Sequence, residues 1–221
     1  MKLSNRFIFL VITGWSVVFV FASVQITYSS PISAFTINKS SNNQRGLVQQ
    51  GKSTAEIDRL ALYLYNEAVK KYEKKLYWKS AVDLIVILDF YTEFTKLDDV
   101  IYLLGNCLYE MGMYDGADRM YRYLLKTIPR TPNLPDALLG LQKVFYQKKD
   151  YKKSLRFYRA LEAHYSHFNG INESRYYAGQ AYFHLGNYTL VPQILRHVST
   201  RSEFYAFGLY TSGLAHLKKK T

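Results

Sequence analysis

Histidine, glutamate and cysteine are the side chains of this sequence whose chemistry would matter most at a functional site. His164 and His167 are three residues apart, a spacing that two metal ligands on one helix can have. No third ligand follows at metal spacing, and Glu162 is two residues from His164, so the two side chains do not face one another on a helix. The single cysteine, Cys107, excludes a disulfide framework and a thiolate metal cage. We therefore expect no metal site and no cofactor.

Catalytic motifs are also missing from the sequence. It contains no G-x-S-x-G, no H-E-x-x-H and no glycine-rich loop that could hold a phosphate. We expect a protein that is not an enzyme, and turn to the elements that would build a binding surface instead.

The charge balance is strongly basic, with 29 Lys and Arg against 17 Asp and Glu and a net charge of +12. Many of these basic residues cluster in two regions, residues 70–79 and 148–159. We interpret the clusters as solvated helix faces, with contact to anionic lipid or acidic polymer as a second reading. Nucleic acid is a third reading, which we set aside because an exported protein seldom meets it.

The N-terminal segment has the layout of an export signal. Lys2 and Arg6 precede residues 7–24, which carry no charge. Cleavage after Ala22 would make this a signal peptide, whereas an uncleaved hydrophobic helix of this length approaches the roughly 20 residues that span a bilayer. Both readings place the rest of the chain outside the cytoplasm, either periplasmic or anchored in the inner membrane through residues 7–24.

Residues 25–52 differ in composition from the rest of the chain. They are rich in Ser, Thr, Asn and Gln and poor in large apolar residues, so they cannot bury enough surface to offset their chain entropy. The sequence therefore divides into a signal peptide or anchor (1–24), a disordered linker (25–52) and one large domain (53–221).

The large domain contains a helical repeat. Segments that begin at Leu103 and Tyr177 align without a gap at a shift of 74 residues, and a third segment lies midway between them. A column of mostly small residues in the first helix of each hairpin contains Val69, Gly105, Gln142, Gly179 and Gly213. A matching column in the second helix contains Ala81, Ala117, Ser154 and Val191. Glycine inside a helix costs about 1 kcal/mol, which indicates that another helix must approach closely there.

This pattern predicts an all-α solenoid of about four and a half helical hairpins. We expect the hairpins near residues 54–94, 98–129, 135–167 and 172–202, followed by a half hairpin at 203–221. Pro192 would break a helix interior, so we expect the helix that contains it to begin near Thr189. The last helix has no partner, which favours either a longer parent protein or a helix that itself caps the array.

The hairpin resembles the tetratricopeptide repeat (TPR) family. The second hairpin matches all eight signature positions of that family, namely Ile101, Leu104, Gly105, Leu108, Ala117, Tyr121, Leu124 and Pro129. The resemblance implies a right-handed superhelix whose first helices line a concave groove that binds peptides or protein segments. It covers about three quarters of the chain.

The register of the repeat identifies the residues that would face this groove. We expect an aromatic surface with amide and lysine donors between the rings. The candidate binding residues are Tyr102, Asn106, Tyr109, Lys143, Tyr146, Tyr176, Gln180 and Phe183. A competing reading makes these rings ordinary packing between helices, because aromatic stripes usually mark core.

These observations favour a non-enzymatic scaffold that binds a peptide or protein segment within a complex of the cell envelope. Two alternatives remain open. The tyrosines and lysines could bind an envelope polymer such as peptidoglycan or a polysaccharide, or the chain could be an accessory subunit of an enzyme encoded elsewhere.

Overall fold

The computed structural model describes residues 9–13, 16–20 and 54–220. The expected linker at residues 25–52 lies outside these ranges. The chain divides into two compact units, at residues 1–43 and 44–221, which we describe separately.

The described part of the N-terminal unit is a pair of short strands. β1 (Phe9–Thr13) and β2 (Ser16–Val20) are antiparallel, with Phe9 opposite Val20 and Thr13 opposite Ser16. The hydrophobic helix expected over residues 7–24 includes residues 7–8, 14–15 and 21–24, which lie outside the described ranges, so it stays a prediction. β-Branched and aromatic residues, which dominate both stretches, favour strands. In the described ranges no helix is both long enough and apolar enough to cross a membrane.

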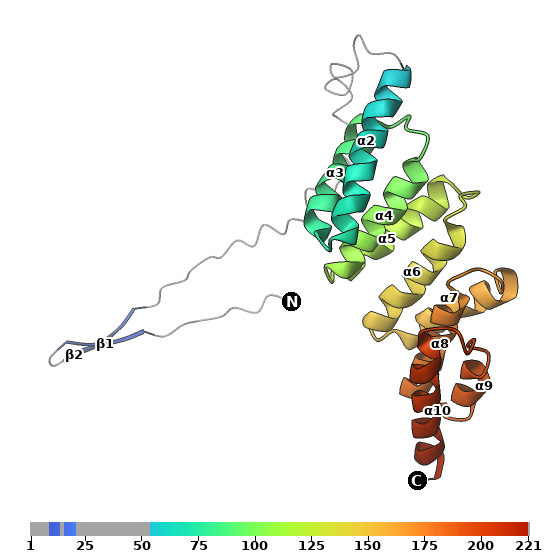
Figure 1. Ribbon diagram of the computed structural model, residues 1–221. Coiled ribbons are helices and arrows are strands. Elements are labelled where there is room, and N and C mark those ends of the chain that lie inside the picture. Colours follow the sequence, from blue (N-terminus) through green and yellow to red (C-terminus); the bar gives the residue numbers. More distant parts are fainter. Residues whose placement is uncertain (1–8, 14–15, 21–53, 221) are drawn as a thin grey trace. The chain divides into compact units, whose positions relative to one another are not determined.

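Residues 54–220 are all-helical, as the repeat pattern predicts, and each helix packs against the next along the chain (Figure 1). The helices are α2 (Thr54–Glu73), α3 (Tyr77–Phe90), α4 (Leu97–Glu110), α5 (Tyr114–Thr127), α6 (Leu134–Gln147), α7 (Tyr151–His164), α8 (Ile171–His184), α9 (Leu190–Leu195) and α10 (Phe204–Lys220). The strongest contacts join α2 to α3, α4 to α5 and α6 to α7, which identifies these pairs as hairpins.

Each hairpin turn contains one residue in the left-handed region of backbone conformation. These residues recur every 37 positions, at Lys75 (φ 59°), Gly112 (φ 72°), Lys149 (φ 59°) and Gly186 (φ 75°). The next amide in each turn bonds back across five residues, as in Met113 N to Leu108 O at 2.8 Å. This is the Schellman arrangement that satisfies the last carbonyls of a helix and reverses the chain.

The buried positions follow the same period of 37 residues. Three columns of equivalent positions are buried in every hairpin, one in the first helices and two in the second helices. The column in the first helices is Ala68, Gly105, Gln142 and Gly179. The columns in the second helices are Ser80, Ala117, Ser154 and Val191, and Leu84, Tyr121, Tyr158 and Leu195. The sequence alignment placed Val69 and Ala81 in the first two columns, at a shift of 36. That register is wrong by one residue in the first hairpin, because Ala68 and Ser80 occupy those positions.

Close approach between helices explains the glycines at two of the expected positions. A β-carbon added to Gly105 would lie 2.6 Å from Tyr121 Cε1, and one added to Gly179 would lie 2.5 Å from Leu195 Cδ2. Gly140, which the alignment did not single out, meets the opposite side of the Tyr121 ring, at 2.5 Å from Cζ. The expectation for Gly213 is wrong, since nothing lies within 4 Å of its β-carbon position.

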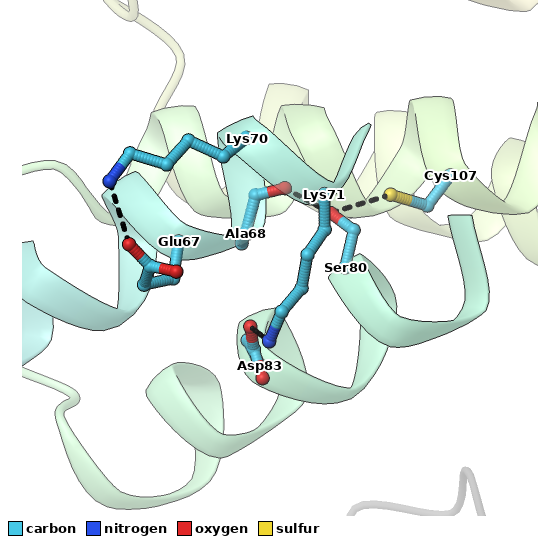
Figure 2. Close-up of polar contacts among 7 residues, drawn as sticks. All are labelled: Glu67, Ala68, Lys70, Lys71, Ser80, Asp83 and Cys107. Carbon is cyan, nitrogen blue, oxygen red and sulfur yellow. Dashed lines mark hydrogen bonds and ion pairs between the residues drawn. The ribbon is translucent and has the colours of Figure 1, made fainter. Parts of the chain in front are cut away.

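The first and third hairpins share a hydrogen bond from a serine that the second and fourth hairpins replace with Ala117 and Val191. Ser80 Oγ donates to the carbonyl of Ala68 at 2.8 Å, and Ser154 Oγ donates to the carbonyl of Gln142 at 2.9 Å. Figure 2 shows the first of these bonds, with Cys107 Sγ donating to the same serine at 3.3 Å. Odd hairpins also turn through a lysine and even hairpins through a glycine. The repeat therefore alternates with a period of 74 residues.

The fourth hairpin is shorter than the others. α9 begins at Leu190 with Pro192 in its first turn, as predicted, but it ends after six residues. α10 then packs on both α8 and α9 through Thr211 and Ala215, which are buried. Its outer face leaves Tyr210 and Leu217 exposed, as the sequence predicts for a last helix without a partner.

Candidate functional site

The first helices of the hairpins form one continuous layer. α2 contacts α4, α4 contacts α6, α6 contacts α8 and α8 contacts α10, whereas α3, α5 and α7 make no comparable contact with one another. Elements that touch their next-but-one neighbours lie on the inner side of a stack, so α4, α6 and α8 present the inner surface. All eight candidate residues lie on these three helices, and all eight are half-buried.

Lys143, on α6, is at the centre of the candidate site. Its Nζ bonds Glu173 Oε1 of α8 at 2.7 Å. The same nitrogen lies 5.1 Å from the ring centroid of Tyr109 and 6.0 Å from that of Tyr177, within reach of cation–π attraction. Burial lowers the pKa of Lys143, but Glu173 and then Tyr109 act in the opposite direction and leave it above the ordinary value. The ammonium is therefore charged at neutral pH.

Tyrosine rings surround this ion pair from the α6 and α8 sides. The rings of Tyr146 and Tyr177 meet edge to face with centroids 5.1 Å apart, and the rings of Tyr177 and Tyr176 are 5.7 Å apart. Tyr176 in turn stacks on Phe204 of α10 at 5.3 Å. Burial raises the pKa of Tyr146 to about 12. The result is a connected row of neutral, half-buried rings across three successive first helices.

The amide side chains of the candidate set are engaged within the protein. Asn106 Oδ1 accepts a hydrogen bond from the Tyr121 hydroxyl at 2.6 Å. Gln180 Nε2 donates to the Tyr176 hydroxyl at 3.1 Å and to Thr211 Oγ1 at 2.8 Å. These amides hold rings and neighbouring helices in place, so the rings and the ion pair are what the surface offers to a ligand.

Three candidate rings also close the hairpin turns. An aromatic pair recurs across each turn with centroids 5.3 to 5.6 Å apart: Tyr72 and Tyr77, Tyr109 and Tyr114, Tyr146 and Tyr151, Phe183 and Tyr188. Phe183 packs with the cluster around Val191 and Leu195. Packing between the two helices of a hairpin therefore accounts for part of the aromatic stripe, as the competing reading expects.

Sequence reasoning missed a column of acids one helical turn before the tyrosines. Asp99, Asp136 and Glu173 occupy the same position of successive first helices at intervals of 37 residues. Asp99 Oδ1 accepts from Asn133 Nδ2 at 2.7 Å, and Glu173 is paired with Lys143. Burial raises the pKa of Asp136. The three-residue spacing from Tyr102 and Tyr176 could have indicated this column, since such residues share a helix face.

The histidines considered for metal binding lie apart from this site. His164 is the last residue of α7, where its ring meets that of Tyr165 at 6.4 Å. Within residues 9–13, 16–20 and 54–220, no three His, Cys, Asp or Glu side chains are grouped as a metal site would need.

With this geometry, residues 54–220 have the fold of a TPR-type helical solenoid. A scan against protein-family models finds no match, and neither does a search of curated protein sequences. Among solved structures, the chain is similar to YrrB, a TPR protein with an unusual peptide-binding site: the TM-score is 0.55 at 19% identity, over 72% of this chain and 78% of YrrB.

Two further structures show the same likeness. BtubC (BKLC) from P. vanneervenii superposes with a TM-score of 0.60 at 13% identity, over 80% of this chain and 79% of BtubC. MamA AMB-1 gives a TM-score of 0.51 at 17% identity, over 74% of this chain and 90% of MamA. At these identities the likeness is one of fold, and the function must be argued from the site.

Proposed function

We propose that this protein is a non-catalytic scaffold that binds a polypeptide segment along the inner layer of α4, α6 and α8. The row of half-buried rings around the Lys143–Glu173 pair carries this proposal. YrrB, which shares the fold, has a peptide-binding site, and that supports peptide as the ligand class.

The chemistry of the row suits an extended chain with apolar or aromatic side chains. Tyrosine supplies a large, rigid contact area at low entropic cost, and such rings dominate the energy of many interfaces. Because Gln180 and Asn106 are bonded within the protein, affinity would come from ring contact more than from amide bonds to the ligand backbone. The Lys143–Glu173 pair adds one group of each charge, so it favours neutral segments or those with charges of both signs.

Site-specific crosslinking in intact cells tests the proposal. A photoreactive amino acid at position 146 of the inner layer should capture a protein partner. The same amino acid at position 123, on α5, is the matched control, because Tyr123 is 40% exposed on a second helix. Capture at both positions to the same extent, or at neither, would contradict binding along the inner layer.

A second measurement links the captured partner to the rings. Peptides that tile the partner should bind the purified protein, and alanine at Tyr102 and Tyr176 together should weaken the best peptide at least tenfold. Unchanged helical circular dichroism would show that the variant is folded. If a polysaccharide or peptidoglycan fraction binds instead, and loses affinity with the same substitutions, the polymer-binding alternative replaces the proposal.

We also propose that the chain is exported, on the strength of the basic start and the uncharged residues 7–24. Fractionation with a carbonate wash distinguishes the two forms of export. A cleaved signal gives a shortened protein in the soluble periplasmic fraction, and an anchor gives full-length protein that stays with the membrane. Recovery of full-length protein in the cytoplasm would contradict both.

A further inference from the structure

The outer face of α3 is apolar at positions that point away from the rest of the array. Trp78 is 63% exposed and Val82, one turn further along the helix, is 44% exposed. Leu76, in the turn that precedes α3, is 43% exposed. Exposing apolar side chains of this size to water is unfavourable, so a cluster of them at one turn indicates an interaction site.

The repeat itself shows that the fold does not need this apolar face. At three positions of α3, the equivalent side chains of the next two hairpins, 37 and 74 residues later, are all charged and exposed, whereas Leu76 corresponds to the half-buried Met113 and Asp150. Trp78, Val82 and Ile85 correspond to Asp115, Arg119 and Arg122 on α5, and to Lys152, Arg156 and Arg159 on α7. The first hairpin is therefore the exception among three equivalent outer faces.

Positive charge borders this apolar face at the α2–α3 turn. Figure 2 shows that two nearby lysines are neutralised, Lys70 by Glu67 at 2.8 Å and Lys71 by Asp83. The remaining three, Lys74, Lys75 and Lys79, are exposed, and none forms an ion pair with the described residues. One exposed carboxylate, Glu73, directly precedes Lys74, and two more lie at the other end of α3, at Asp89 and Glu93. The turn thus combines exposed apolar side chains with unneutralised cations.

We propose that this turn, made of Leu76, Trp78 and Val82 with Lys74, Lys75 and Lys79, is a docking surface for an anionic lipid bilayer. Tryptophan favours the boundary between headgroups and acyl chains, where its ring is buried and its N–H stays hydrated. Lysines beside it contact lipid phosphates, and their stems cover apolar surface. The acids at the far end of α3 orient the turn, rather than the whole helix, toward the membrane.

A bilayer accounts for both the exposed apolar side chains and the lysines of this turn. An acidic polymer would account for the lysines alone. Charge alone would serve a polymer, and the α6–α7 turn already offers charge without an exposed apolar residue. Its Lys149 and Lys152 are exposed and form no ion pair with the described residues, and its Lys148 is exposed but paired with Asp115. The intervening Tyr151 is half-buried and stacks on His184 at 4.8 Å. This second basic turn is therefore the internal control. The proposed membrane surface is on another face than the peptide site, and neither depends on the other.

The test uses Trp78 itself as the reporter, because residues 7–24 could hold the chain on a vesicle by another route. In the full chain, Trp15→Phe leaves Trp78 as the single tryptophan. On vesicles of phosphatidylcholine with phosphatidylglycerol, Trp78 emission should shift to shorter wavelength and be quenched by brominated acyl chains. Vesicles of phosphatidylcholine alone should produce neither change.

Substitutions then separate the two halves of the surface. In the Trp15→Phe chain, replacing Lys74, Lys75 and Lys79 with Gln should weaken the fluorescence-monitored binding about a hundredfold, at about fivefold per lysine. Leu76→Ser should weaken it about tenfold, since it removes one inserted side chain. Replacing Lys148, Lys149 and Lys152 with Gln should change it less than threefold. Circular dichroism shows whether each variant is folded.

Two results with vesicles would overturn the proposal. One is unchanged Trp78 emission on anionic vesicles with which the protein co-sediments, because the chain would then be bound elsewhere. The other is an equal loss of binding from the two sets of lysine substitutions with none from Leu76→Ser, which would mean non-specific attraction of a basic protein. A soluble polyanion such as heparin that produces the same blue shift would likewise replace the bilayer by an acidic polymer.

Discussion

The ring of Tyr121 occupies the space that a side chain at Gly105 would need. A β-carbon at Gly140 would lie 2.5 Å from Cζ of the same ring, so both glycines leave the room that this ring takes up. This contact joins the two helices of the second hairpin and the first helix of the third, and it explains why glycine is tolerated inside α4.

Gly105→Ala should therefore destabilise the protein. Alanine gains about 1 kcal/mol of helix propensity, but overpacking against Tyr121 costs about 1–3 kcal/mol, so we expect a net loss of up to about 2 kcal/mol in the free energy of unfolding. Urea denaturation measures it. Gly213→Ala is the control, since its β-carbon has no neighbour within 4 Å, and this variant should be stabilised by up to about 1 kcal/mol. Equal effects at the two sites would contradict the close approach.

Lys149→Gly should stabilise the protein. Lys149 has φ 59°, a conformation that costs a residue with a β-carbon about 1 kcal/mol and costs glycine almost nothing. The neighbouring Lys148 has φ −73°, so Lys148→Gly should destabilise instead. Thermal unfolding of the two variants should thus give shifts of opposite sign, and a shift of the same sign would show that the turn does not limit stability.

How far the sequence predicts this fold can be judged at these turns. Gly112 and Gly186 have the left-handed conformation that glycine commonly adopts at the end of a helix, so the residue type itself indicates these turns. Lys75 has the same backbone conformation, but lysine gives no sign of it, so the first hairpin was aligned one residue out of register. An alignment based on residue type alone accepts Val69 and Ala81, which are next to the correct residues, Ala68 and Ser80.

The sequence assigns the candidate residues to particular helices but does not show their contacts. The helical register assigns all eight to the first helices α4, α6 and α8, where the structure has them. It cannot show which of them are already bonded, because the partners come from other helices: Tyr121 for Asn106, Thr211 for Gln180 and Glu173 for Lys143. Such pairs depend on how neighbouring hairpins are stacked.

Gln142→Ala should be strongly destabilising for a related reason. Gln142 is fully buried where two other hairpins have glycine, and its amide donates to the carbonyl of Ser174 at 2.8 Å and accepts from the hydroxyl of the same serine. Truncation leaves the buried hydroxyl of Ser174 without its acceptor and opens a cavity, so we expect a loss of about 2–3 kcal/mol. Gln147→Ala, at an exposed position of the same helix, should change stability by less than about 0.5 kcal/mol. Comparable losses in urea titrations of the two variants would refute the role of this bond network.

Stability should fall steeply in alkaline solution. Burial raises the pKa of Tyr65, Tyr146 and Tyr158 to about 12 in the folded protein, against about 10 in an unfolded chain. The folded state therefore holds these protons more tightly, and the stabilisation is complete below pH 10 and lost as the pH rises toward 12. Urea midpoints across this range measure the loss. Replacing the three tyrosines with Phe should flatten the curve, and an unaltered curve would assign the loss to other groups.

Hairpins with the serine hydrogen bond and a lysine turn alternate with hairpins that lack this bond and turn through glycine. This alternation has a consequence for how the array arose and how it can be shortened or lengthened. A lineage that doubled a block of two hairpins would leave these alternating turns and inter-helix contacts, whereas duplication of single hairpins would have made them uniform. Shortening or lengthening the protein should accordingly preserve its junctions when whole blocks of 74 residues are moved. A cut of 37 residues would instead join two hairpins of the same kind, a junction that the protein does not contain.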